Sequence, residues 1–426
     1  MRRGNGVLRR APGFRYLFLA TLASGVGTWI AAIALTVDIY DRTGSGTWVS
    51  ALLIADFLPT VAIGLTLGPL VDRFPRRALM IAADVVRLAV FCALPFTDSP
   101  GAIVALAAVA GFATGFFKPA ARAEMPNLVP DEDLPKANAL FQSAESLTNT
   151  AGPFVGGALV AVSGPHVAYW LNAITFLASA LLIMRVPQRV VQGARALGRS
   201  HLRDLGEGFS IVLRSRALLT VLVAWSLVTI SNAGVNVAEV FLAKEVFESG
   251  DFGFGVLSAG FGAGLVIGSF STSALLARRG IASVYGGSIM LMAFGIGAAA
   301  ISPNVWVATA CAVVSGSGNG AAIVSNSLFV QRGVPDRLRG RAFSVIMSTN
   351  FAFLGLGMVG AGKLTDAFGA RWVWGSAAVV AGIAAVVAYI LASGVDAAAL
   401  SGRADETPEP EAMPPPKAAI ATPPVG

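Results

Sequence analysis

The sequence predicts an all-α integral membrane protein in which twelve transmembrane helices form two pseudo-symmetric six-helix bundles and both termini lie in the cytoplasm. Three observations support this fold class: an apolar composition, a series of long apolar segments, and a repeat that relates the two halves of the chain. Hydrophobic residues make up 55% of the 426 residues, and charged residues only 13%. A soluble globular domain has about 25% charged residues, so the composition excludes an ordinary soluble protein.

Twelve segments are apolar and long enough to cross a membrane. Crossing ~30 Å of hydrocarbon takes a helix of ~20 apolar residues. The segments are residues 14–38, 48–71, 79–97, 101–121, 137–163, 167–187, 217–243, 252–277, 282–301, 305–329, 341–366 and 370–394. We therefore expect a multi-pass protein of the cell inner (cytoplasmic) membrane, in contact with the lipid bilayer.

The positive charges lie in alternate loops, and this predicts the orientation. With a cytoplasmic N-terminus, 26 of the 31 Lys and Arg residues fall on the inner side and four on the outer side. The remaining one, Arg87, lies inside the third segment, where Asp84 is one turn away and can pair with it. Because Lys and Arg concentrate in cytoplasmic loops, the net charge of +7 indicates topology, and no nucleic-acid partner is expected.

A repeat relates the two halves of the chain. Seven matches occur at a fixed offset of 205 residues, most of them at Gly or Pro, among them Gly111 with Gly316 and Gly152 with Gly357. The repeat predicts a duplicated six-helix unit, and parallel repeats with a site between them are an architecture of transporters.

The expected domains follow from this repeat. An N-terminal six-helix bundle (residues 1–187) and a C-terminal one (217–394) are joined by a cytoplasmic linker (188–216). Helical spacing of apolar residues in the linker predicts a surface amphipathic helix, which either couples the two halves or rests on lipid headgroups. The tail (395–426) has seven prolines and cannot bury a core, so we expect it to be disordered.

A short charged loop joins the second and third segments. Gly68 allows close helix packing, and Asp72 can accept charge-assisted hydrogen bonds at the N-terminus of a neighbouring helix. Arg73, Arg76 and Arg77 complete a group that we call the cytoplasmic gate. A latch of this kind, made in one conformation and broken in another, fits alternating access. The alternative, a simple helix stop with cytoplasmic arginines, does not explain Asp72 or Gly68.

The fifth segment contains a second motif, which consists of Gly152, Pro153, Gly156 and Gly157. Proline removes a backbone hydrogen bond and bends a helix, and the glycines allow another helix to pack against the bend. An ordinary packed kink is the alternative interpretation.

These motifs resemble those of the major facilitator superfamily. The loop matches the family pattern Gly-x-Leu-x-Asp-Arg-x-x-Arg-Arg at every specified position, and the second motif resembles the Gly-Pro-x-x-Gly-Gly motif of its drug/proton antiporters. Asp84-x-x-Arg87 and residues 125–129 are similar to the twelve-span efflux branch that contains macrolide exporters and the enterobactin exporter. The resemblance implies the major facilitator fold and export. The arginine motif that many antiporters carry in the fourth span has no counterpart in Val109–Ala121.

Polar residues form stripes on three otherwise apolar segments. They are Gln142, Glu145 and Asn149 in the fifth segment, Thr229, Asn232, Asn236 and Glu239 in the seventh, and Ser315, Asn319 and Asn326 in the tenth. Lipid cannot satisfy polar groups, so we expect the stripes to converge on a wet substrate cavity. Amides that tie helices together are the alternative.

Carboxylates inside the spans are candidates for proton coupling, because ionisable groups in a membrane are costly and by default indicate function. The candidates are Glu145, Asp56 and Glu239. A carboxyl group that binds a proton on one side and releases it on the other can exchange protons for a bound substrate.

The predicted function is secondary active export of amphiphilic small molecules (a drug, an antibiotic or a siderophore) by proton-coupled antiport. No nucleotide-binding loop and no nucleophile–base set occur in the sequence, so we expect no enzyme activity, no cofactor, no metal site, and a monomer. Two alternatives are an uptake or facilitative carrier on the same fold and a transport-inactive sensor or partner subunit.

The sequence generates a first testable prediction. Glu145→Gln is expected to abolish proton-driven efflux while leaving substrate binding largely intact, because Gln keeps the shape of Glu and cannot carry the proton. Efflux from cells that express the variant, with and without a protonophore, measures this. Unchanged efflux would remove Glu145 from the mechanism.

Overall fold

The computed structural model describes residues 5–66, 74–187, 209–210, 212–333 and 336–393, and within these ranges the chain consists of helices joined by short turns, without a strand. The elements are α1 (Asn5–Arg10), α2 (Pro12–Thr43), α3 (Gly46–Thr66), α5 (Arg76–Ala93), η1 (Leu94–Phe96), α6 (Pro100–Leu128), η2 (Asp131–Asp133), α7 (Leu134–Ser163), α8 (Pro165–Ile183), α10 (Arg216–Phe241), η3 (Leu242–Val246), α11 (Gly250–Arg278), α12 (Ile281–Ala300), α13 (Val305–Gly333), α14 (Asp336–Phe368) and α15 (Ala370–Ala392).

Eleven helices of the described chain are long and apolar enough to cross a membrane. They correspond to eleven of the twelve predicted segments. The remaining predicted segment forms α7, which is 30 residues long. This helix is not among the eleven because its Gln, Glu and Asn residues, which the sequence analysis noted, lower the hydropathy of its apolar stretches.

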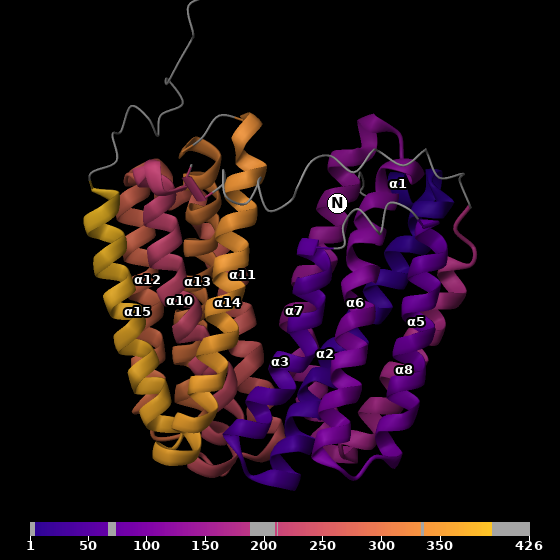
Figure 1. Ribbon diagram of the computed structural model, residues 1–426, viewed down its shortest axis with the longest axis horizontal. Coiled ribbons are helices and arrows are strands. Elements are labelled where there is room, and N and C mark those ends of the chain that lie inside the picture. The colour runs from indigo at the N-terminus through magenta and orange to yellow at the C-terminus, as the bar shows by residue number, and fades with distance from the viewer. Residues whose placement is uncertain (1–4, 67–73, 188–208, 211, 334–335, 394–426) are drawn as a thin grey trace, which may run out of the picture.

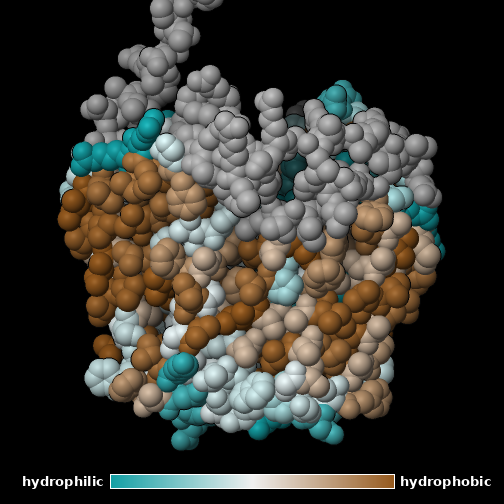
Figure 2. Space-filling view, viewed as in Figure 1, coloured by the Kyte–Doolittle hydropathy of each residue, from teal (hydrophilic) through white to brown (hydrophobic). Residues whose placement is uncertain are grey.

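The surface of the molecule matches a multi-pass membrane protein. Figure 2 shows hydrophobic residues over the middle of the visible face and hydrophilic residues gathered toward its two ends. Large apolar side chains project outward from several helices, among them Phe270, Leu356 and Trp372, each more than two-thirds exposed. An exposed apolar surface of this extent is stable only in contact with lipid.

The repeat is visible in the order and packing of the helices. The starts of α5 and α12, of α6 and α13, and of α8 and α15 are each 205 residues apart, which confirms the predicted offset. The packing repeats as well, because α2 packs on α8 and α3 on α6, just as α10 packs on α15 and α11 on α13. Figure 1 shows the earlier and the later helices as two groups, with α1 and the end of α15 at the same end of the molecule.

The two halves contact each other through two helix pairs that the repeat relates. Helix α3 packs on α14, and α7 packs on α11. The contact is closest where α3 and α11 begin and where α7 and α14 end, at the lower end of the molecule in Figure 1. There the backbones approach at Gly46 and Gly362 and at Gly157 and Gly255. We call this end the closed end.

The Asp84–Arg87 ion pair predicted from the sequence is confirmed. Both side chains are buried, and the Arg87 guanidinium donates to Asp84. Ser179 of α8 also donates to Asp84, at 2.7 Å. The guanidinium carbon lies 4.5 Å and 4.3 Å from the ring centres of Phe117 and Phe176. This pair therefore ties α5 to α6 and α8 within one half.

Several predicted features lie outside the described residues. These are Gly68, Asp72 and Arg73 of the cytoplasmic gate, most of the linker helix, and the tail at 395–426.

Glycine allows α11 and α13 to pack with their backbones close together. A Cβ atom built on Gly316 would lie 2.1 Å from the Phe261 carbonyl oxygen, and one on Gly264 would lie 2.1 Å from the Val313 carbonyl oxygen. Backbone atoms cannot move aside as a flexible side chain can, so any larger residue must push the two helices apart.

This contact generates a second prediction. Gly316→Ala is expected to destabilise the protein by about 1–3 kcal/mol, the usual cost of overpacking, and to lower the melting temperature of the purified protein. Gly287→Ala on α12 is the matched control, because nothing lies within 4 Å of that added Cβ. Equal melting temperatures for the two variants would contradict the prediction.

Candidate functional site

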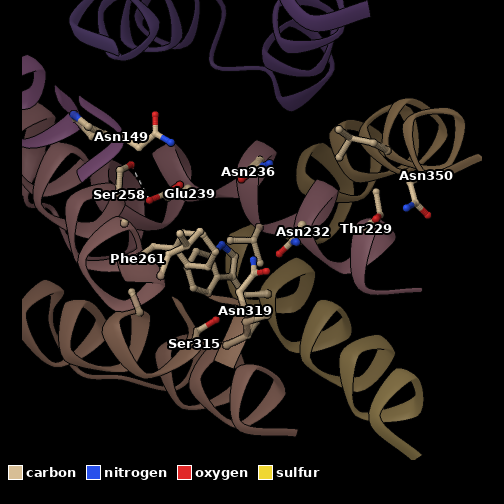
Figure 3. Close-up of a pocket in the computed structure, with 18 of the residues that line it drawn as sticks. Asn149, Thr229, Asn232, Asn236, Glu239, Ser258, Phe261, Ser315, Asn319 and Asn350 are labelled. Atoms are coloured by element: carbon tan, nitrogen blue, oxygen red, sulfur yellow. Dashed lines mark hydrogen bonds between the residues drawn. The ribbon is translucent and has the colours of Figure 1, made fainter. Parts of the chain in front are cut away.

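A cavity of about 440 Å³ lies mainly within the C-terminal half. Helices α10, α11, α13, α14 and α15 form most of its wall, and α2 and α7 contribute from the other half. Its polar lining residues are Asn149, Thr229, Asn232, Asn236, Glu239, Ser258, Ser315, Asn319 and Asn350, most of which are drawn in Figure 3. Its aromatic lining residues are Trp29, Trp225, Phe261, Phe351 and Trp374.

The structure brings together residues from all three predicted polar stripes. Seven of the predicted residues line the cavity: Asn149, Thr229, Asn232, Asn236, Glu239, Ser315 and Asn319. On α10 the four residues recur at intervals of three or four, and on α13 Ser315 and Asn319 are four apart, so one face of each of these two helices is turned toward the cavity. Helix α7 contributes Asn149.

Four predicted candidates do not line this cavity. They are Gln142, Asn326, Glu145 and Asp56. Gln142 and Asp56 are exposed, whereas Asn326 is buried on α13, seven residues beyond Asn319 toward the end of that helix.

Glu145 has an ionic partner that the sequence did not indicate. Arg122, on α6, donates to the Glu145 carboxylate at 3.0 Å and 3.3 Å. The Glu145 side chain is about one-third exposed and that of Arg122 about two-thirds exposed. Arg122 lies one residue beyond the stretch Val109–Ala121, in which the sequence analysis found no arginine motif.

Glu239 is the one charged side chain among the residues that line the cavity. Its Oε1 accepts a hydrogen bond of 2.8 Å from the Ser258 hydroxyl on α11. Figure 3 shows these two residues beside each other at the edge of the cavity nearest Asn149. Among the residues that the structure describes, no Lys, Arg or His lines the cavity, so none of them gives Glu239 a cationic partner there.

Four polar atoms of cavity-lining residues are buried without a hydrogen-bond partner. They are the Ser315 hydroxyl, the Asn319 carbonyl oxygen, the Asn350 amide nitrogen and the Trp374 indole nitrogen. Buried polar atoms are nearly always paired, so an unpaired set around one cavity is a place where a ligand or water supplies the missing partners.

The motif in α7 lies where three helices meet. A Cβ on Gly152 would approach Trp29 of α2 to 2.4 Å, and one on Gly157 would approach Gly255 of α11 to 2.5 Å. Gly156 faces Ile30 of α2. Pro153 lines the cavity.

Asn149 links the motif region to α2. Its side-chain oxygen accepts a hydrogen bond of 2.8 Å from the Trp29 indole, and both residues line the cavity.

Two residues of the predicted cytoplasmic gate are described. Arg76 donates to the Ala123 carbonyl of α6 at 2.7 Å, and Arg77 donates to the Met184 carbonyl at the end of α8. These two arginines therefore connect α5 to its neighbours within the N-terminal half. Within the described ranges, no cluster of His, Cys, Asp and Glu could hold a metal ion.

Comparison with known families identifies this architecture. A family model described as Major Facilitator Superfamily matches residues 17–350 and, in a second match, residues 240–424. The chain belongs to this superfamily. Its members are transporters, so the chain is a multi-pass membrane transporter and not an enzyme.

Curated relatives from bacteria match most of the chain at low identity. Macrolide efflux protein A of Streptococcus pyogenes is 23% identical over 367 residues, which covers 84% of this chain and 90% of the relative. The multidrug efflux pump Tap of Mycobacterium tuberculosis is 25% identical over 383 residues, covering 84% and 88%. The MFS-type transporter YfiS of Bacillus subtilis is 24% identical over 376 residues, covering 85% and 89%. The efflux branch noted from the motifs is thus among the relatives.

Solved structures show the same fold. A bacterial homologue of the iron transporter ferroportin in an inward-facing state has a TM-score of 0.72 at 16% identity, covering 90% of this chain and 99% of that one. A bacterial homologue of the lysosomal transporter Spinster, also inward-facing, has a TM-score of 0.72 at 14% identity, covering 90% and 97%.

Proposed function

We propose that this transporter exports amphiphilic small molecules in exchange for protons, by alternating access. The observation that carries the proposal is the cavity, which combines aromatic walls, scattered amides and one carboxylate, and which residues of both halves line. The names of two relatives, a macrolide efflux protein and a multidrug efflux pump, support export as the direction.

The proposed topology has twelve spans, of which α7 is the twelfth, with both termini in the cytoplasm. The 30 residues of α7 extend roughly 45 Å at 1.5 Å per residue, enough to cross the bilayer. Its polar residues can cross because α2 and α11 pack against it. Residues 1–187 and 217–394 then form the two bundles that move relative to each other, within a monomer.

In this topology the closed end faces the outside, and the described conformation opens inward. Four hydrogen bonds from the start of α3 converge on the Asp366 carboxylate of α14. They come from the Ser45 hydroxyl (3.1 Å), the Gly46 amide (2.5 Å) and the amide and hydroxyl of Thr47 (3.1 Å and 2.6 Å). A carboxylate at a helix N-terminus is stabilised by the helix dipole, so Asp366 acts as an outer latch between the halves.

A second set of contacts closes the same end. Lys244 of η3 reaches Asp41 of α2 and, at 2.6 Å, Asp251 of α11. Tyr40 donates to Glu245 at 3.0 Å. The two bonds that join the halves, Lys244 to Asp41 and Tyr40 to Glu245, must break before the cavity can open outward.

Glu239 is the proposed proton-coupling carboxylate, because it lies in the cavity where substrate binds. Protonation from the outside would remove its charge, and release to the cytoplasm would restore it. Glu145 is the alternative proton-coupling carboxylate. Protonation of Glu145 would break its ion pair with Arg122, and this would loosen the contact between α6 and α7. Asp56, outside the cavity, is the third candidate.

The third prediction tests this assignment. Glu239→Gln is expected to abolish export driven by a pH gradient in proteoliposomes, because the amide cannot bind the transported proton. Downhill equilibration of substrate is expected to persist, since Gln keeps the shape of the cavity. Glu248→Gln, in the exposed turn after η3, is the matched control with the same change of charge.

Two outcomes would redirect the assignment. If Glu145→Gln abolishes export and Glu239→Gln does not, coupling runs through the Arg122–Glu145 pair. If a pH gradient drives uptake into the compartment that corresponds to the cytoplasm, the protein is an uptake carrier and the proposed direction is wrong.

The fourth prediction tests the outer latch. Asp366→Asn is expected to raise the fraction of the protein that is open to the outside several-fold, because it weakens hydrogen bonds that hold the closed end together. A hydrogen bond to a charged group contributes about 1.5–3 kcal/mol when buried, and less where water reaches it. The measurement is the rate at which an impermeant maleimide, added outside, labels Asn236→Cys in a protein with Cys92 and Cys311 replaced.

Lys363→Gln provides the control for the latch, because it alters the charge near the same end of α14 without changing the α3 cap. Equal labelling rates for Asp366→Asn and the unmodified latch would show that this carboxylate does not hold the outer end closed.

A further inference from the structure

The lining of the cavity carries information about the charge of the substrate. Glu239 has no cationic partner among the lining residues, and its one hydrogen bond comes from Ser258. A carboxylate beside apolar and aromatic walls, where the effective dielectric constant is lower than in bulk water, repels an anion and attracts a cation more strongly than it would in water. The cavity is therefore unsuited to anionic ligands, including the catechol-type siderophores that the sequence left open.

The walls favour an aromatic or apolar body beside that charge. Trp29, Trp225, Phe261, Phe351 and Trp374 all line the cavity. Indole and phenyl faces attract cations through the ring quadrupole and also bury apolar surface. A volume of about 440 Å³ is in the range of sites that hold one drug-sized molecule.

A second, uncharged polar group of side chains lies apart from Glu239. Ser315 and Asn319 lie one turn apart on α13, and Figure 3 places them across the cavity from Glu239 and Ser258, with Phe261 between. The Ser315 hydroxyl, the Asn319 carbonyl oxygen and the Trp374 indole nitrogen are buried and unpaired. We call these three residues the neutral pole.

The chemistry of the neutral pole indicates its ligand. The Trp374 indole can only donate, the Asn319 oxygen can only accept, and the Ser315 hydroxyl can do both. A ligand group that both accepts and donates, such as an amide or a hydroxyl, satisfies all of them, whereas a hydrocarbon leaves them unpaired.

We propose that the substrate is a bipolar monocation, with a basic amine at Glu239, an amide or hydroxyl at the neutral pole, and an aromatic or apolar body between them. This inference rests on the proposed function, in that the cavity is taken as the transport site. It narrows the substrate from amphiphiles in general to one charge type and one arrangement of polar groups.

Three matched probes test the proposal on the full-length protein in nanodiscs. The first is 4-(2-diethylaminoethyl)benzamide, in which the aromatic ring lies between the basic amine and the amide. The second replaces the amine nitrogen by carbon, giving 4-(3-ethylpentyl)benzamide. The third replaces the carboxamide by an isopropyl group, giving N,N-diethyl-2-(4-isopropylphenyl)ethylamine. Binding is measured by quenching of tryptophan fluorescence, with titration calorimetry as the second readout.

The expected result is that the first probe binds at least tenfold more tightly than either analogue. In Glu239→Gln, the first probe should bind no more tightly than the carbon analogue but still more tightly than the amide-free analogue. In the double variant Ser315→Ala/Asn319→Leu, it should bind more tightly than the carbon analogue but no more tightly than the amide-free one. Ser325→Ala, a buried serine of the same helix outside the cavity, should change neither ratio.

The proposal is overturned if the neutral analogue binds as tightly as the amine, or if the double variant weakens all three probes alike. Size-exclusion profiles and melting temperatures of the variants exclude misfolding as the cause. Binding selectivity without export in proteoliposomes would refute the proposed function and leave this inference standing. Export without selectivity would refute this inference alone.

Discussion

Hydrocarbon offers no hydrogen-bond partners, and this constraint determines where the polar side chains of this protein lie. Each polar group on a membrane-crossing helix has to find its partner inside the protein or reach water. Three groups of polar side chains meet this requirement to different extents. Asp84, Arg87 and Ser179 pair within one half. Asp366 binds across the two halves at the closed end. A third group remains unpaired around a cavity.

The third group is the most informative about function. Unpaired buried polar atoms lower the stability of the protein, and side chains with a purely structural role have no reason to be left unpaired. Leaving a buried donor or acceptor without a partner costs about 1–3 kcal/mol. Four such atoms belong to residues that line one cavity. When a binding site is empty, the polar atoms that bind the ligand have no partners, and the protein is less stable by this amount. In a purely structural contact, the polar atoms would be paired with each other.

The sequence predicted helix positions, the repeat and much of the cavity lining, since all of these follow from patterns along one helix. It did not predict which residues of a polar stripe line the cavity and which do not. Asn149 lines the cavity and Gln142, two turns earlier on α7, does not, because helices cross at an angle and a stripe leaves the cavity as the helix passes it. The same reason separates Asn319 from Asn326 on α13.

Partners from other helices could not be predicted at all. Nothing in the sequence places Arg122 beside Glu145, or Asp366 at the start of α3. Ser258 and Trp374 belong to no polar stripe, and their place in the cavity depends on the packing of α11 against α13 and of α15 against α10. Each of these contacts depends on tertiary packing, which local patterns do not contain.

Helix α7 connects the cavity to the closed end. Its Asn149 and Pro153 line the cavity, and one turn further on Gly157 lies against Gly255 of α11. In the proposed alternating access, opening the closed end would separate these two glycines, and the missing backbone hydrogen bond at Pro153 would let the end of α7 move without its whole length. The separation would change the distance between Asn149 and the part of α11 that carries Ser258. In the proposed transport cycle, the motif in α7 therefore lies where a change at the closed end would alter the shape of the cavity.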